Sequence, residues 1–355
     1  MQLRSATSGR PECIGPGPLC VHRLTTLYAT DDRITPMSDP AVNKAHTRGR
    51  TGAPTSGKRR HVGRNHALIV TIVMMLAVAT VAYLTDSTLA VRAERSLARA
   101  LLTSPRVDYE PQVTLKGFPF TTHARDGKFS GSIITARGVP IEGCESRGRC
   151  FAEMTVLTGA VRPGTGGGFR FDSGDTLTAD DVTASARLDS PNLGRLLGIT
   201  DLYVTTPAEP GKAGAGGPGD GVLTRSHGVV FTGTVAVPPT PPGGLPTPQT
   251  APSASGFTGE TVRVSVLVNL SLSDDRLRVS AYGLYQGPEE HADAGDLDTN
   301  PAKADLLQAV LRRFTMTLPP IPLPWGVSPS SATSAGSDIL IEGRSDHRDL
   351  SLNSF

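Results

Sequence analysis

The chain has 355 residues, of which 38% are hydrophobic and 5% aromatic, with 39 glycines, 29 prolines and a formal net charge of +2. Glycine shows no three-residue period, which excludes a collagen-like chain, and the length allows two average domains or one large β-rich domain with tails. The charge is unevenly placed, because residues 1–66 carry 11 Lys and Arg against 4 Asp and Glu, whereas the remainder carries 24 against 29. A basic head before a mildly acidic body indicates a membrane topology signal rather than a nucleic-acid-binding protein.

Residues 1–57 are predicted to be a disordered cytoplasmic tail, since scattered Gly, Pro, Ser and charged residues show no apolar period there. Translation from Met37 is an alternative start that would keep the basic flank that follows. Cys13 and Cys20 lie in this tail and are predicted to be free thiols without a function.

Residues 58–86 combine a basic flank, KRRHVGR, with an apolar run of 18 uncharged residues at 67–84. A helix of this length spans roughly 27 Å, which is close to the ~30 Å hydrocarbon core of a bilayer. The basic flank predicts that the N-terminus stays in the cytoplasm and that the chain after residue 85 lies outside. A cleaved signal peptide, which would leave a secreted or periplasmic protein, is the alternative.

A second helix is predicted over residues 89–102, with Leu and Ala on one face and a neighbouring basic stripe formed by Arg92, Arg95 and Arg99. Two interpretations of the stripe stay open. It can lie along anionic lipid headgroups as a membrane-surface site, or it can be the ordinary solvated side of a helix that covers the soluble domain.

From residue 111 onward the pattern is typical of β structure. The strongest case is residues 260–272, where six apolar residues alternate with mostly polar ones, and the Ser-Asp-Asp-Arg turn at 273–276 predicts an antiparallel hairpin. Further strands are predicted at residues 113–115, 129–139, 151–157, 176–188, 202–206, 227–237, 277–281 and 337–343.

Residues 88–355 are predicted to form one extracytoplasmic β-rich domain with two low-complexity loops inside it, at 207–221 and 238–256. A helix is predicted over residues 300–314, where Asn300 suits the cap position and Pro301 the first turn.

Cys144 and Cys150 stand on the predicted outer side, separated by a five-residue segment that contains a glycine, and they are predicted to form a disulfide. No metal site, cofactor site or catalytic motif is found. The acidic residues Asp172, Asp175, Asp180 and Asp181 are interpreted as surface turn residues rather than as a cation site. The sequence therefore predicts a protein without catalytic activity.

Two short motifs carry a resemblance to a known family. The Gly-Phe-Pro-Phe element at 117–120 follows a membrane-targeting segment and a short helix, and Leu-Pro-Trp-Gly-Val at 323–327 precedes the last strand. Over residues 88–352 the chain resembles the LmeA-like family of actinobacterial envelope proteins, which bind anionic phospholipid and take part in mannan elongation. The chain departs from that family at Thr121 and Thr122 and in the 238–256 insert.

The resemblance implies lipid binding, and the residue pattern is compatible with it: the long one-sided strands and the helices predict an α+β fold in which a mostly antiparallel, curved sheet wraps around or packs on one or two helices, as in tubular lipid-binding proteins. It also implies a phospholipid or glycolipid partner, a membrane location and contacts with envelope biosynthesis proteins. The candidate lipid-binding residues are Phe118, Phe120 and Trp325, with Phe120 and Trp325 expected to face lipid and Phe118 to lie in the core. Two other functions stay open: a scaffold that recruits partners through its Pro-rich loops, and a hydrolase with dispersed catalytic residues.

Overall fold

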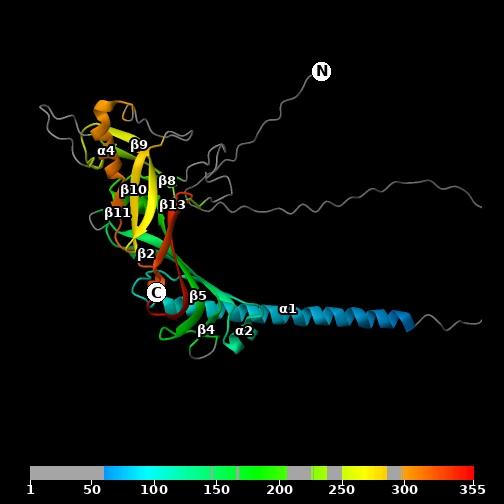
Figure 1. Cartoon of the computed structure of the whole chain (residues 1–355). Coiled ribbons are helices and arrows are strands. Elements are labelled where there is room, and N and C mark those ends of the chain that lie inside the picture. The colour runs from blue at the N-terminus through cyan, green and yellow to red at the C-terminus, as the bar shows by residue number, and fades with distance from the viewer. Residues whose placement is uncertain are drawn as a thin grey trace, which may run out of the picture. The chain divides into compact units, whose positions relative to one another are not determined.

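The structure is a computed structural model that describes residues 60–144, 147–164, 168–205, 225–226, 228–237, 250–285, 297 and 299–355. The contacts divide the chain into residues 1–63 and 64–355. Apart from the first four residues of the first helix, every element below belongs to the second unit. The described residues form four α-helices and antiparallel sheets, which confirms the predicted α+β class (Figure 1).

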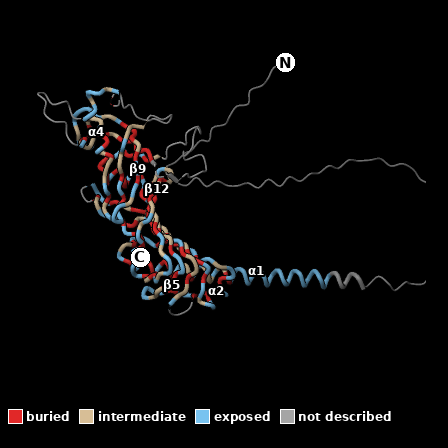
Figure 2. Tube along the Cα trace, in the orientation of Figure 1, coloured by how far each residue is buried: buried red, intermediate tan, exposed pale blue. Residues whose placement is uncertain are grey.

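Helix α1 (Arg60–Leu101) is one continuous helix of 42 residues, where the sequence predicts two helices. The junction holds no Gly or Pro, and its hydroxyl side chains bond back to the helix itself, as when Thr85 Oγ1 donates to the Val81 carbonyl at 2.8 Å. Residues 66–85 are exposed, whereas Ala93, Leu97 and Leu101 are fully buried in the hydrophobic core. Figure 2 shows the same change along α1, from an exposed stretch to a buried one where the helix meets the strands.

The first sheet has eight strands in the order β1-β2-β3-β5-β13-β12-β7, with β4 paired to β5. Its longest pairing joins β5 and β13, in register from Asp189 opposite Asp338 to Thr176 opposite Ser351. Its strands are β1 (Gln112–Lys116), β2 (Gly131–Ile141), β3 (Cys150–Thr158), β4 (Val161–Pro163), β5 (Thr176–Asp189), β7 (Arg225–Ser226), β12 (Pro329–Ala335) and β13 (Asp338–Ser351).

The second sheet has five strands in the order β11-β10-β9-β8-β6, and β12 of the first sheet contacts β8 and β9. The predicted hairpin is confirmed, because Ser273 pairs with Arg276 across Asp274 and Asp275, which both have positive φ as a tight two-residue turn requires. The strands are β6 (Tyr203–Thr205), β8 (Gly228–Ala236), β9 (Thr261–Ser273), β10 (Arg276–Leu284) and β11 (Met316–Thr317).

The remaining helices are short. The predicted C-terminal helix is present as the 3₁₀ turn η1 (Pro301–Lys303) and helix α4 (Ala304–Arg313), and Asn300 caps it by accepting from the Ala302 N–H at 3.0 Å. Helices α2 (Phe120–Asp126) and α3 (Ser190–Leu197) and strand β12 are not predicted from the sequence. A second 3₁₀ turn, η2 (Pro324–Gly326), carries Trp325.

Of the two predicted low-complexity loops, the first lies outside the described residues, and so do residues 238–249 of the second. Within the described end of the second loop, residues 250, 255 and 256 are exposed, whereas Ala251 is packed against helix α4. Ala251 is 1% exposed, and its N–H donates to the Ala309 carbonyl of α4 at 2.9 Å.

Candidate functional site

The two phenylalanines of the Gly-Phe-Pro-Phe element lie in opposite environments. Phe118 is 71% exposed and its ring lies 6.2 Å from that of Tyr83, near the end of the apolar run of α1. Phe120 is 2% exposed and stacks on Phe129, with ring centroids 5.7 Å apart. The expected core position of Phe118 is therefore wrong, and Phe120 lies in the hydrophobic core instead. Helix α2 begins at Phe120 and turns that ring inward, whereas Phe118 stands before the helix in an exposed loop.

Asp86 fixes this element to α1. Its carboxylate accepts from the backbone N–H groups of Phe120 and Thr121 and from the Thr121 hydroxyl, each at 2.8 Å. The first N–H groups of a helix have no partner within the helix, so Asp86 acts as the missing cap of α2 from a distant segment. Asp86 is the first buried residue of α1 after the exposed apolar run.

Trp325 is also buried, at 8% exposure, where the sequence analysis expects a lipid-facing side chain. Its ring packs edge-to-face on Phe355 at 5.0 Å, and its Nε1–H donates to the Ser351 carbonyl at 2.9 Å. The partner for the indole N–H explains the burial, because an indole can enter a core once its donor is satisfied. Trp325 nevertheless lines a cavity of about 580 Å³ together with Arg106 and Phe355.

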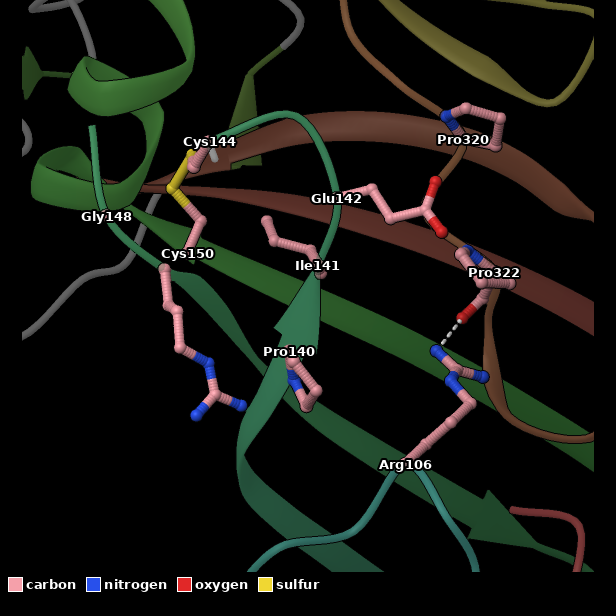
Figure 3. Close-up of a pocket in the computed structure, with 10 residues that line it drawn as sticks. Arg106, Pro140, Ile141, Glu142, Cys144, Gly148, Cys150, Pro320 and Pro322 are labelled. Atoms are coloured by element: carbon pink, nitrogen blue, oxygen red, sulfur yellow. Dashed lines mark hydrogen bonds between the residues drawn. A yellow bond between two sulfur atoms is a disulfide. The ribbon is translucent and has the colours of Figure 1, made fainter. Parts of the chain in front are cut away.

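A larger cavity of about 870 Å³ lies beside this one, and the two share Arg106 and Pro322 (Figure 3). Its walls come from the end of β2, the disulfide loop that leads into β3, the turn after α1 and the Pro-rich segment before η2. The lining residues are Arg106, Pro140, Ile141, Glu142, Cys144, Gly148, Arg149, Cys150, Pro320 and Pro322. The cavity thus combines apolar walls with two arginines and one glutamate.

Arg106 is the least solvated charge in this cavity. Its Nη2 donates to the Pro322 carbonyl at 2.7 Å, and burial lowers the pKa of its guanidinium below the ordinary value. Among the described residues no carboxylate forms an ion pair with it, whereas Arg149 pairs with Asp108 at 3.3 Å and lies over the Phe151 ring. A guanidinium that has lost part of its water and has spare donors is suited to bind a phosphate or carboxylate.

The predicted disulfide between Cys144 and Cys150 is confirmed, with the two Cα atoms 5.7 Å apart. Both cysteines line the 870 Å³ cavity, so the disulfide closes the loop that forms one of its walls. Sequence reasoning identifies this bond but not its position in a cavity wall. Arg149 lies between the two cysteines, so a basic residue inside a disulfide loop is a sequence signal for this site. Arg106 follows α1 and belongs to no recognisable motif.

The three arginines of the basic stripe are all exposed. Arg92 and Arg99 line a separate cavity of about 440 Å³ together with Arg170, Phe169 and Phe171, while Arg95 does not line it. Because α1 is continuous and rises about 1.5 Å per residue, Arg92 lies roughly 12 Å and Arg99 roughly 22 Å beyond Leu84 along the helix axis. A helix that crosses a bilayer with residues 67–84 therefore cannot also lie flat on its headgroups.

The described residues offer no group of three His, Cys, Asp or Glu side chains placed to hold a metal ion. The predicted acidic turn residues have local partners instead. Asp175 accepts from the Asp172 N–H at 2.8 Å, and Asp180 pairs with Arg162 at 2.9 Å.

Comparison with known proteins gives one family for the chain. The model of a family described as LmeA-like phospholipid-binding matches residues 84–344, which is most of the chain. The search of curated proteins and the search of solved structures give no match. The matched segment begins at the end of the apolar run and includes Arg106, the disulfide loop, Pro320 and Pro322, and the chain belongs to the LmeA-like phospholipid-binding family.

Proposed function

We propose that the protein binds one anionic phospholipid or phosphate-bearing glycolipid in the 870 Å³ cavity, with the phosphate on Arg106 and the acyl chains against Ile141 and the proline-lined walls. The observation that carries this proposal is a half-buried arginine in a largely apolar cavity, with no carboxylate paired to it among the described residues. The volume lies within the usual range of ligand sites, roughly 300–1,000 Å³.

The energetics of such a site divide between the two ends of the lipid. Each buried methylene contributes about 0.8 kcal/mol, and this term does not select among headgroups. A charge-assisted hydrogen bond from Arg106 to a phosphate contributes on the order of 1.5–3 kcal/mol. We therefore expect the chains to give most of the affinity and Arg106 to give the preference for an anionic headgroup.

We further propose that α1 anchors the protein in a membrane and that residues 88–355 lie outside the cytoplasm. Residues 67–84 are apolar and exposed along the helix, with side chains such as Met74 at 68%, which is costly in water and favourable in lipid. The basic flank supports a cytoplasmic N-terminus, and the disulfide suits an oxidising compartment. In this position the protein would present lipid to envelope lipoglycan assembly, and binding rather than catalysis would be its activity.

The test uses the full-length protein in mixed micelles that hold equimolar phosphatidylglycerol and phosphatidylcholine. Native mass spectrometry reports which lipid stays bound to the wild type, to Arg106→Gln and to a control, Arg278→Gln, whose arginine is exposed on β10. We expect one bound phosphatidylglycerol on the wild type and on the control. Arg106→Gln should reduce it by about tenfold or more, which corresponds to the loss of one charge-assisted hydrogen bond.

A second variant guards against a folding effect at Arg106, whose guanidinium also bonds to Pro322. Ile141→Asn keeps both arginines but places an amide on the apolar wall, so it should weaken both lipids alike. Equal binding of both lipids by the wild type, or unchanged binding by both variants at wild-type thermal stability, would contradict this site.

A further inference from the structure

The loop at residues 117–119 and helix α2 both contact α1 over one short stretch of that helix, from Tyr83 to Asp86. Asp86 receives three hydrogen bonds from Phe120 and Thr121, and the Phe118 ring packs on Tyr83. Tyr83 is the second-last residue of the apolar run, and Asp86 lies only two residues beyond its end. The loop is therefore held beside the point where α1 would leave a bilayer.

The shape of this loop is fixed locally. Gly117 has a φ of +134°, and a Cβ at that position would lie 2.6 Å from the His123 ring. That ring is held in turn by a hydrogen bond of 2.9 Å between its Nδ1 and the Lys128 carbonyl. The chain therefore turns sharply at Gly117 before α2, and the Phe118 side chain is left exposed.

Phe118 has the highest exposure of any phenylalanine among the described residues, at 71%. Among the described residues, the aromatic ring that packs next to it is that of Tyr83, which is itself 59% exposed. Aromatic side chains at this depth are typical of the belt that proteins place at the membrane–water interface. A second partly exposed ring, Phe169 at 44%, packs edge-to-face on Phe120 at the start of α2.

Basic side chains flank the same loop. Lys116 precedes it, and Arg125 and Lys128 lie at the far end of α2, all three exposed, against one exposed acid, Asp126. This arrangement gives a net positive rim around an exposed aromatic, which fits a leaflet that contains anionic lipid.

We propose that residues 117–126 form a membrane foot that rests on the outer leaflet, with Phe118 inserted beside Tyr83 and the basic rim at the headgroups. This inference rests on the proposed membrane anchoring by α1 and adds a second contact to it. Two contacts at one level restrict the tilt of the domain, so the Arg106 cavity would be held at a set height and orientation above the bilayer.

The experiment measures the depth of single introduced tryptophans in the full-length protein, reconstituted in nanodiscs of phosphatidylcholine and phosphatidylglycerol. Three variants are compared: Phe118→Trp in the foot, Tyr83→Trp in the apolar run, and Tyr109→Trp as a control. Tyr109 is 65% exposed and precedes β1, whose other end leads into the foot. Lipids brominated on the acyl carbons nearest the headgroup quench the fluorescence of inserted indoles. The unsubstituted protein, whose single tryptophan is Trp325, gives the fluorescence that must be subtracted from that of each variant.

We expect Phe118→Trp to be quenched as strongly as Tyr83→Trp and Tyr109→Trp to remain unquenched. Quenching of Tyr83→Trp without quenching of Phe118→Trp would overturn the foot while leaving the anchor in place. Absence of quenching at both positions would overturn the anchor and the foot together. All three positions are exposed, so substitution by tryptophan should preserve the fold, and equal melting temperatures would verify this.

Discussion

Asp86 shows at the scale of one residue how a distant side chain can set local structure. Helix α2 has seven residues and includes two consecutive threonines, so its own tendency to form a helix is weak. The three hydrogen bonds to Asp86 satisfy donors that the helix cannot satisfy itself.

Replacing Asp86 by Ala should therefore loosen α2 before it affects the rest of the domain. We expect hydrogen–deuterium exchange at the Phe120 and Thr121 amides to become several-fold faster, with little change in β5 and β13. Asp126→Ala, an exposed acid at the end of the same helix, is the control and should leave both amides unchanged. Uniformly faster exchange across the domain would contradict a local capping role.

Asp338 gives a pH-dependent prediction. Burial raises the pKa of its carboxyl above the ordinary 3.8, although Ser337 and Arg187 partly oppose the shift. The folded state then binds this proton more tightly than the unfolded state, so this group's contribution to stability falls as pH rises from about 3.8 through the folded pKa. Asp338→Asn should accordingly be the more stable protein at neutral pH, and the difference should shrink near pH 4. Thermal unfolding of both proteins at the two pH values measures it, and a difference independent of pH would contradict it.

At the scale of elements, the disulfide loop both stabilises the fold and forms a wall of the 870 Å³ cavity. Closing a loop between cysteines six positions apart contributes about 2 kcal/mol to the free energy of unfolding. The double variant Cys144→Ser/Cys150→Ser should lose about that much and should also bind less lipid, because the loop walls the cavity.

The matched control for this variant is Cys13→Ser/Cys20→Ser, which removes the two cysteines of the predicted tail and should change neither quantity. If the cavity-loop variant lost stability but kept its lipid occupancy, the disulfide would not be needed for lipid binding, and the prediction would be wrong. Native mass spectrometry and thermal unfolding of the same samples supply both readings.

Elements whose signal is local could be predicted from the sequence. The alternation in residues 260–272 and the Asp-Asp turn identify β9, β10 and their hairpin, and Asn300 with Pro301 identifies the start of the C-terminal helix. Helices α2 and α3 are too short for a periodic pattern. The continuity of α1 is not evident from the sequence, because Thr85 to Thr88 are polar and resemble an exit from the membrane helix, although they include no helix-breaking residue.

At the scale of the whole molecule, lipid binding should appear as added stability. A ligand present at about 100 times its Kd stabilises the folded state by about 2.7 kcal/mol. Phosphatidylglycerol should therefore raise the melting temperature by several degrees, and phosphatidylcholine by less. In Arg106→Gln the two lipids should give equal shifts; a retained preference for phosphatidylglycerol would place the headgroup elsewhere.

The candidate site itself could not be predicted because it depends on long-range topology. Arg106, Ile141 and Pro322 come from three separate segments, and only the packing of α1, β2 and the chain before η2 brings them together. The Gly-Phe-Pro-Phe motif identifies Phe118 and Phe120 as candidates, but the motif alone does not show which of the two side chains turns inward. Family resemblance indicated the ligand class, whereas the geometry was needed to find a cavity for it.

The continuity of α1 also limits how this protein can vary in length. One residue inserted between Asp86 and Ala93 would rotate every later side chain by about 100° and shift it by 1.5 Å, turning Leu97 and Leu101 away from the core. The same insertion before residue 67 would displace only chain outside the domain. Relatives should therefore differ freely in length ahead of the apolar run and hardly at all between it and the end of α1.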